Sequence, residues 1–238
     1  MLKSYLSGIF ILIFSLLPIS CENIESLGLT ETEIIGGLKE ALQLGARAAG
    51  DSLSQTNGYF GNAAMKIWLP KEAQPVLDVA STLGLQSQID ELVLLLNRGA
   101  EKAAVKAAPI FVDAITSMTL TDGMNILKGS DSAATAYLRG KTYNQLTSAF
   151  APEINKAMDQ VGAAALWNTI FSEYNAYANT FAGQLLNLKP VNPSLGGYAT
   201  ERALTGLFIR VRNEEKFIRD IPAKRTTELL RKVFAEQD

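Results

Sequence analysis

The sequence predicts an all-α protein, a single compact bundle of about eight helices after a cleaved signal peptide. Apolar residues recur at intervals of three and four along most of the chain, which is the period of an amphipathic helix. No stretch alternates apolar and polar residues over the length that a convincing strand requires. Apolar residues form 47% of the 238 residues and charged residues 19%, so the chain can bury a substantial core.

The N-terminus has the layout of a secretory signal that ends at Cys21. Lys3 precedes an apolar run at residues 9–17, and Ser20 is the small residue expected before a cleavage site. The arrangement resembles the lipobox of bacterial lipoproteins, in which the cysteine receives a diacylglyceryl group, although Pro18 stands where a lipobox usually has leucine. The run is shorter than the ~20 residues of a bilayer span. We therefore expect lipidation at Cys21, with a retained anchor helix or simple secretion as alternatives.

Three segments follow from this layout. We expect residues 1–20 to be the lipoprotein signal peptide, residues 21–28 a polar tether and residues 29–238 the helical domain. The segment KPVNPSLGG at residues 189–197 is a possible hinge, so a division into two parts there is the alternative. The chain has one cysteine, and its acylation leaves no thiol for a disulfide, a metal or a nucleophile.

Capping residues, glycines and prolines mark where the predicted helices start and stop. Thr30 and Glu33 form a capping-box pattern at the start of the first helix. Pro70 and Gly84 fit the start and the end of the second. Between these helices, SQTNGYFGNAAMKIW at residues 54–68 is the longest candidate loop, with a turn-forming Asn–Gly pair beside aromatic residues that look exposed.

Prolines and capping residues also divide the rest of the chain. A break or bend is expected near Pro109 in the third helix. A long helix capped by Ser130 or Asp131 runs until it meets Pro152, and Pro222 can open the last helix. We therefore expect helices over residues 30–53, 70–84, 86–118, 121–128, 130–152, 163–186, 198–219 and 222–234.

The composition excludes several classes of functional site. The chain has no histidine, so serine–histidine and cysteine–histidine catalysis, histidine-bearing zinc sites and ordinary di-iron bundles cannot be built. A net charge of −2 gives no overall electrostatic attraction to nucleic acid. We expect no cofactor and no metal.

A polar cluster of Asn97, Arg98 and Glu101 lies in an otherwise apolar helical stretch. Asn97 and Glu101 share a helix face, and together they suggest a hard-cation ligand set or a general base. Further ligands would have to come from elsewhere, with Asp113 and Asp131 the nearest candidates. The alternative is that Arg98 or another basic group pairs with Glu101 and fixes helix register. We favour the ion pair, because two or three oxygens fall short of the ~6–8 ligands of calcium.

Five aromatic residues recur at helical spacing in the segment 163–186. They are Trp167, Phe171, Tyr174, Tyr177 and Phe181. Such a stripe would suit a groove for an apolar ligand, with the tyrosine hydroxyls orienting it. A face that packs on the core has the same pattern, and this is the interpretation we favour.

The start of the long helix, GSDSAAT at residues 129–135, is a candidate anion site. A glycine-led helix start has backbone N–H groups that can bind phosphate. The P-loop pattern is missing, and Asp131 puts a negative charge where the anion would sit. We therefore expect helix capping there rather than anion binding.

The C-terminal region is more basic than the rest of the mature chain. Residues 200–238 contain nine Lys or Arg side chains against seven Asp or Glu. The excess can attract anionic lipid or an acidic partner. Because acids such as Glu214 and Glu215 lie at helical spacing from the bases, we favour a solvated, salt-bridged surface.

Three stretches resemble one bacterial family. They are NGYFGNAAMKIWLP, NRGAEKAAVKAAPIFVDAITSM with ILKGSDSAATAYLRGKT, and YATERALTGLFIRVRNEEKFIRDIPAKRTTELLRKVF. In order and spacing they are similar to the domain of unknown function 4197. The resemblance implies an all-helical protein directed to the cell envelope. It supplies no activity, catalytic residue or cofactor.

Three functions are consistent with these observations. We favour a membrane-tethered lipoprotein that acts as a helical binding or scaffold module in the bacterial envelope, facing the periplasm. Its partners would be the membrane, through the N-terminal lipid, and an envelope protein or apolar ligand, with no nucleic acid. The alternatives are a carrier of an apolar ligand or lipid in a groove lined by Trp167–Phe181, and a carboxylate- or cation-dependent enzyme centred on Glu101. Buried Trp167 and Phe171 would disfavour the carrier, and scattered acids the enzyme.

Overall fold

The computed structural model describes residues 30–82, 84–159, 163–191, 194–221, 223, 225 and 227–234. Every regular element in these ranges is a helix, so the predicted all-α class is confirmed. The predicted signal peptide, the lipidated Cys21 and the tether lie outside the described residues and stay predictions.

The helices follow one another in the order that the sequence predicts. They are α1 (Glu31–Ser54), the short 3-10 helix η2 (Lys71–Ala73), α2 (Gln74–Thr82), α3 (Gln86–Ala104), α4 (Ala107–Thr116), α5 (Leu120–Leu127), α6 (Ala133–Asp159), α7 (Ala163–Ala178), α8 (Phe181–Leu185), α9 (Leu195–Asp220) and α10 (Glu228–Phe234). The last helix begins later than predicted, and Pro222 lies outside the described residues.

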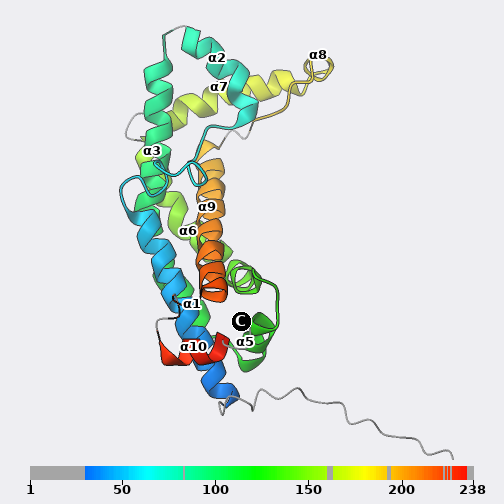
Figure 1. The fold of residues 1–238 in the computed structure, drawn as a ribbon. Helices are drawn as coiled ribbons and strands as arrows, with labels where there is room; N and C mark the ends of the chain where they lie inside the picture. The colour runs from blue at the N-terminus through cyan, green and yellow to red at the C-terminus, as the bar shows by residue number, and fades with distance from the viewer. Residues whose placement is uncertain are drawn as a thin grey trace, which may run out of the picture.

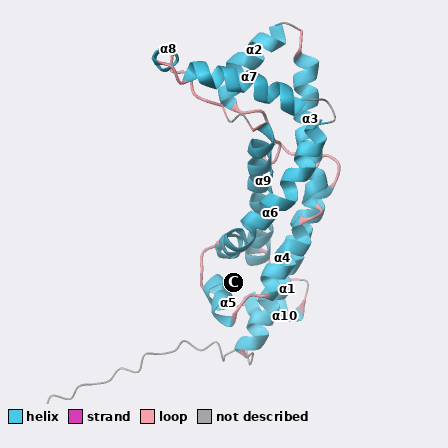
Figure 2. Ribbon diagram, turned by 180° about the vertical axis from the view of Figure 1, so that it is seen from behind, coloured by secondary structure: helices cyan, strands magenta, loops and turns pink. Residues whose placement is uncertain are grey.

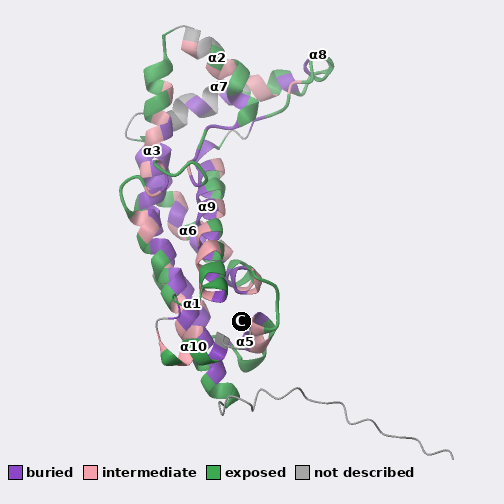
Figure 3. Cartoon of the chain, in the orientation of Figure 1, coloured by how far each residue is buried: buried purple, intermediate pink, exposed green. Residues whose placement is uncertain are grey.

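The longest helices, α1, α3, α6 and α9, run along the length of the molecule (Figure 1). Helix α6 packs between α3 and α9, and α1 packs against α4 and α9. Helices α2, α7 and α8 lie at one end, whereas α5 and α10 lie at the other, beside the start of α1 (Figures 1 and 2). The faces that these helices turn toward one another are buried and form one apolar cluster among the described residues (Figure 3).

Local capping decides several helix ends. The Thr30 backbone N–H donates to the Glu33 carboxylate at 2.7 Å, and the Glu33 N–H donates to the Thr30 hydroxyl at 3.2 Å, as the capping-box pattern predicts. Thr119 and Asp122 form a second capping box at the start of α5, which the sequence analysis missed. Gly84 has a φ of 84°, the left-handed conformation that ends a helix at glycine.

The predicted break near Pro109 is present, whereas the predicted helix end at Pro152 is wrong. The break between α3 and α4 falls at residues 105–106, and Pro109 lies in the first turn of α4, where a backbone N–H needs no helical partner. Helix α6 does not end at Pro152 but continues for seven residues to Asp159. Pro152 is exposed, so solvent can reach the carbonyl that it leaves unpaired, while Ile154 beyond it is fully buried. Tertiary packing therefore overrides the helix-breaking tendency.

The aromatic stripe is buried only in its first part. Trp167 and Phe171 are buried with ring centroids 4.1 Å apart, and Tyr174 is half-buried against Phe171. Tyr177, still on α7, is 50% exposed. Phe181 is 78% exposed and belongs to the next helix, because α7 stops at Ala178. The core interpretation therefore applies to the first three residues and fails for the last two.

We expect Phe171→Ala to lower the free energy of unfolding by about 3 kcal/mol, because it leaves a cavity beside Trp167. Urea unfolding of the purified protein measures this change. Tyr177→Ala on the exposed face of the same helix is the control and should change stability by no more than about 0.5 kcal/mol. Equal effects of the two substitutions would place Phe171 outside the core.

Candidate functional site

The loop at residues 55–70 joins α1 to η2 and lies against α3 and α9. Two buried polar side chains of α3, Asn97 and Glu101, hold this loop by its backbone. We call residues 55–70 the pinned loop. It overlaps the longest candidate loop predicted from the sequence, residues 54–68, and it contains the whole of the first stretch that carries the family resemblance, residues 57–70.

The Asn97 side chain hydrogen-bonds both backbone groups of Ile67. Its Oδ1 accepts a hydrogen bond from the Ile67 N–H at 2.9 Å, and its Nδ2 donates to the Ile67 carbonyl at 2.9 Å and to the Val93 carbonyl at 2.7 Å. The residue is fully buried. Asn175 of α7 holds the buried Val191 in the same two-way manner, at 2.7 Å and 2.5 Å. Side-chain amides thus satisfy loop backbone that has no secondary-structure partner.

Glu101 satisfies the other end of the pinned loop. Its Oε1 accepts the N–H groups of Tyr59 and Phe60, both at 3.2 Å. Its Oε2 pairs with Arg98 at 2.5 Å, and Arg98 donates onward to Asn57 Oδ1 at 2.9 Å. The predicted ion pair is therefore present. The network holds a loop rather than helix register, because the partners of the carboxylate are loop N–H groups.

Tyr59 fixes the pinned loop to α9. Its ring is fully buried, and its hydroxyl donates to the Ala203 carbonyl at 2.9 Å. Burial, and secondarily the nearby Glu101 carboxylate, raises the pKa of the Tyr59 phenol, so the hydroxyl stays a donor at neutral pH. Gly206 allows this approach, because a Cβ there would lie 3.1 Å from the Tyr59 ring. The prediction that the aromatic residues of this loop are exposed is therefore wrong for Tyr59.

The outer side of the pinned loop presents two aromatic rings and a cation. The Lys66 ammonium lies 4.0 Å from the ring centroid of Phe60 and 4.0 Å from that of Trp68. Trp68 is 57% exposed although its neighbours Ile67 and Leu69 are buried. Asn97 and Glu101 hold the loop backbone on its inner side, so these side chains have defined positions at the surface.

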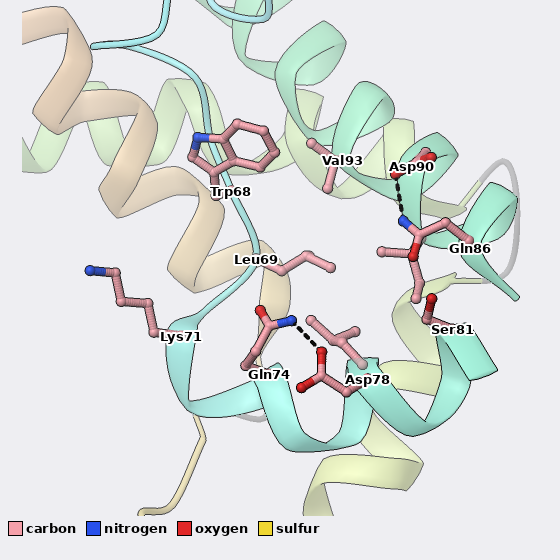
Figure 4. Close-up of a pocket in the computed structure, with 11 residues that line it drawn as sticks. Trp68, Leu69, Lys71, Gln74, Asp78, Ser81, Gln86, Asp90 and Val93 are labelled. Carbon is pink, nitrogen blue, oxygen red and sulfur yellow. Dashed lines mark hydrogen bonds between the residues drawn. The ribbon is translucent and has the colours of Figure 1, made fainter. Parts of the chain in front are cut away.

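Trp68 forms one wall of a pocket of about 370 Å³ between the pinned loop, α2 and α3 (Figure 4). The apolar surface comes from Leu69 and Val93 together with Leu77 and Ile89. The carboxylates of Asp78 and Asp90 lie at the rim. Each accepts a hydrogen bond from a glutamine amide, Asp78 from Gln74 at 2.7 Å and Asp90 from Gln86 at 2.8 Å. The remaining lining residues are Lys71 and Ser81. We call this cavity the Trp68 pocket. It can accept an apolar group and hydrogen-bond donors.

The proposed ligands of a cation do not come together. Asp113 is exposed on α4, and no described contact joins it to Asn97, Arg98 or Glu101. In the described ranges, no group of three or more His, Cys, Asp or Glu side chains is arranged to hold a metal ion.

A second buried polar cluster lies at the start of α6, which was the candidate anion site. The carboxylate of Glu215, on α9, accepts the N–H groups of Ala134 at 3.0 Å and Thr135 at 2.9 Å. Arg219 donates to the same carboxylate at 3.2 Å and to the Ile126 carbonyl at 3.0 Å. An internal carboxylate thus takes the place of an external anion.

This finding corrects two predictions. Ser130 and Asp131 do not satisfy these N–H groups, which bond instead to Glu215. Glu215 is buried rather than part of a solvated surface, whereas Glu214 does pair with Arg210 at 2.6 Å as predicted. No local signal distinguishes the two glutamates, because both stand at helical spacing from arginines.

In the part of the chain that the structure describes, no single helix is long and apolar enough to cross a membrane. Taken together, residues 86–116 and 120–127 have the length and apolar composition of a membrane span, but the two segments meet at an angle of 108°.

The chain matches a known protein family. A family model described as protein of unknown function (DUF4197) matches residues 28–235. No curated protein and no solved structure matches the chain.

Proposed function

We propose that the chain, which belongs to the DUF4197 family of unknown function, is a binding module of the bacterial envelope. The geometry of the pinned loop supports the binding role. Its ligand would bind at the outer side of the pinned loop and in the Trp68 pocket. The ligand class that fits is amphipathic, with an apolar part against Trp68 and Leu69 and hydrogen-bond donors near Asp78 and Asp90.

One observation carries the proposal. Asn97 and Glu101 are buried at 0% and 4% exposure, and each directs its oxygen atoms to the backbone of the same loop. Burying such groups is costly unless every hydrogen bond is made, and a fully satisfied network specifies one conformation. A loop held in this way loses little conformational freedom when a ligand binds, which favours affinity. The exposed Trp68 is the kind of anchor that binding sites use.

The same contacts weigh against the two alternatives. The Glu101 carboxylate is 4% exposed and its oxygens are engaged by two N–H groups and Arg98, so it has little capacity left for a substrate. Trp167 and Phe171 are buried in the core, so they do not line an open groove. A binding role at the pinned loop requires neither an exposed catalytic carboxylate nor an internal channel.

We expect phenethylammonium to bind the Trp68 pocket saturably in isothermal titration calorimetry. Trp68→Ala should weaken this binding at least about tenfold, since it removes the main apolar wall. It should barely change the melting temperature, because Trp68 is 57% exposed. Phe181→Ala, which removes an even more exposed ring outside the pocket, is the matched control and should bind as the native chain does.

A second comparison tests the carboxylates. Phenethyl alcohol keeps the ring but lacks the ammonium donors, so Asp78→Asn should weaken phenethylammonium more than the alcohol. Absence of saturable binding by either compound, or equal binding by native and Trp68→Ala chains, would contradict the proposal.

The location of the module rests on the N-terminal pattern. We expect Cys21→Ala to abolish fatty-acid labelling of the protein and to release it from membranes washed at high salt, because a covalent lipid survives such a wash and electrostatic contacts do not. Metabolic labelling and membrane fractionation measure both effects. Ser20→Ala, which keeps a small residue before the cysteine, is the control. Unchanged membrane retention of Cys21→Ala would indicate an uncleaved helix, a protein partner or another apolar contact of the chain with the membrane.

A further inference from the structure

Helix α8 forms an exposed apolar protrusion. Tyr177, Phe181, Leu185 and Leu186 are 50%, 78%, 69% and 63% exposed, respectively. Figure 1 shows α8 projecting from the end of α7, away from the rest of the molecule. We call these four residues the α8 tip. Adjacent large apolar side chains that are this exposed indicate a contact with a partner or a membrane.

Two properties of the α8 tip favour a membrane as its partner. The 15 residues from Tyr174 to Leu188 carry no charged side chain. Backbone N–H groups of this turn have partners within the turn. The Gly183 N–H donates to the Thr180 hydroxyl at 3.1 Å, and the N–H groups of Leu186, Asn187 and Leu188 donate to the carbonyls of residues 182–184 at 3.0–3.2 Å. A segment that enters lipid must satisfy its backbone in this way, because lipid offers no hydrogen-bond partners. The backbone of this turn can therefore enter lipid without leaving these N–H groups unpaired.

A cationic pocket lies at the base of the α8 tip. It has a volume of about 280 Å³, and it is lined by Lys71, Glu72, Pro75, Tyr174, Asn187, Leu188 and Lys189. Both lysines are exposed, and within the described residues neither forms an ion pair. Lysines placed just behind an apolar tip lie at the level of lipid phosphates when the tip enters a bilayer.

From these observations we propose that the α8 tip inserts into the surface of a bilayer that contains anionic lipid, and that Lys71 and Lys189 bind the headgroup phosphates. The apolar side chains supply the hydrophobic contact, and the lysines supply the preference for anionic lipid. The tip and the start of α1 lie at opposite ends of the molecule (Figures 1 and 2), so this contact is separate from a lipid at Cys21.

Flotation with vesicles tests the proposal on unlipidated protein, residues 21–238 with Cys21→Ser, which contains every described residue. The vesicles are phosphatidylcholine with roughly a third phosphatidylglycerol. We expect Phe181→Ser/Leu185→Ser to reduce the bound fraction about tenfold. The control, Leu44→Ser/Val105→Ser, also removes two exposed apolar side chains, 43% and 65% exposed, and should bind normally. Equal binding by the two double variants would overturn the proposal.

Two further measurements separate insertion from other contacts. Trp68 and Trp167 also fluoresce, so the emission of the Phe181→Trp variant is compared with that of the native chain. The difference should shift to shorter wavelength on adding these vesicles and be quenched by lipids brominated in their chains; an unchanged difference contradicts insertion. Lys189→Gln should weaken binding to the anionic vesicles but not to pure phosphatidylcholine. Complete displacement by millimolar inorganic phosphate would indicate a free-anion site instead. Concentration-dependent dimerisation that the tip variant abolishes, without vesicle binding, would make the tip a self-association surface.

Discussion

Glu215→Ala is expected to lower the free energy of unfolding by about 5 kcal/mol, the largest effect of any single substitution considered. The carboxylate satisfies two N–H groups at the start of α6 and the side chain of Arg219, which is 7% exposed. Its removal leaves a buried guanidinium without its carboxylate and two helix N–H groups without acceptors. The contact also joins α9 to the α5–α6 junction, so the loss affects packing between helices.

The neighbouring glutamate provides the matched control. Glu214 pairs with Arg210 at 2.6 Å, but the two side chains are 16% and 29% exposed. Glu214→Ala should cost less, about 2 kcal/mol or below, because the Arg210 side chain is 29% exposed and water can reach part of it. Urea unfolding of both variants at neutral pH measures the difference. Equal destabilisation by the two substitutions would show that Glu215 does not serve as the buried cap of α6.

Glu101→Ala is expected to lower the free energy of unfolding by about 4 kcal/mol and to release the pinned loop from α3. Two buried N–H groups, those of Tyr59 and Phe60, lose their acceptor. The effect is smaller than at Glu215 because the Arg98 side chain is 31% exposed and can turn to water. Urea unfolding measures the loss of stability. Hydrogen exchange measures the release of the loop: the Tyr59 and Phe60 amides should exchange faster in the variant, relative to the amides of α9.

Two further variants make this prediction specific. Glu153→Ala removes an acid whose partner, Lys106, has a side chain 45% exposed, and it should cost about 1 kcal/mol or less. Asn97→Ala should release the other end of the pinned loop. The double variant Asn97→Ala/Glu101→Ala should therefore lose less free energy of unfolding than the two single variants lose together. A melting temperature unchanged by Glu101→Ala, with divalent cations stabilising only the native chain, would indicate a metal site instead.

The candidate site could be predicted only in part. The Asn–Gly turn and the clustered aromatics identified the loop, and the helix spacing of Asn97, Arg98 and Glu101 identified the polar cluster. The contact between the loop and the polar cluster could not be predicted, because Asn97 bonds to Ile67, 30 positions away, and Glu101 bonds to Tyr59, 42 positions away. The side of the loop that each aromatic ring faces also depends on this attachment.

Sequence alone determined the all-α class, the order of the helices and most helix ends, because capping boxes, glycines and the helical period act within a few residues of each other. Only the tertiary structure decided that α6 passes through Pro152, that Phe181 leaves the aromatic face of α7 and that Glu215 caps a helix 80 residues away. These outcomes depend on how helices pack against one another. Burial of Ile154 outweighs a lost hydrogen bond, and a buried carboxylate is stable only where distant N–H groups and an arginine meet it.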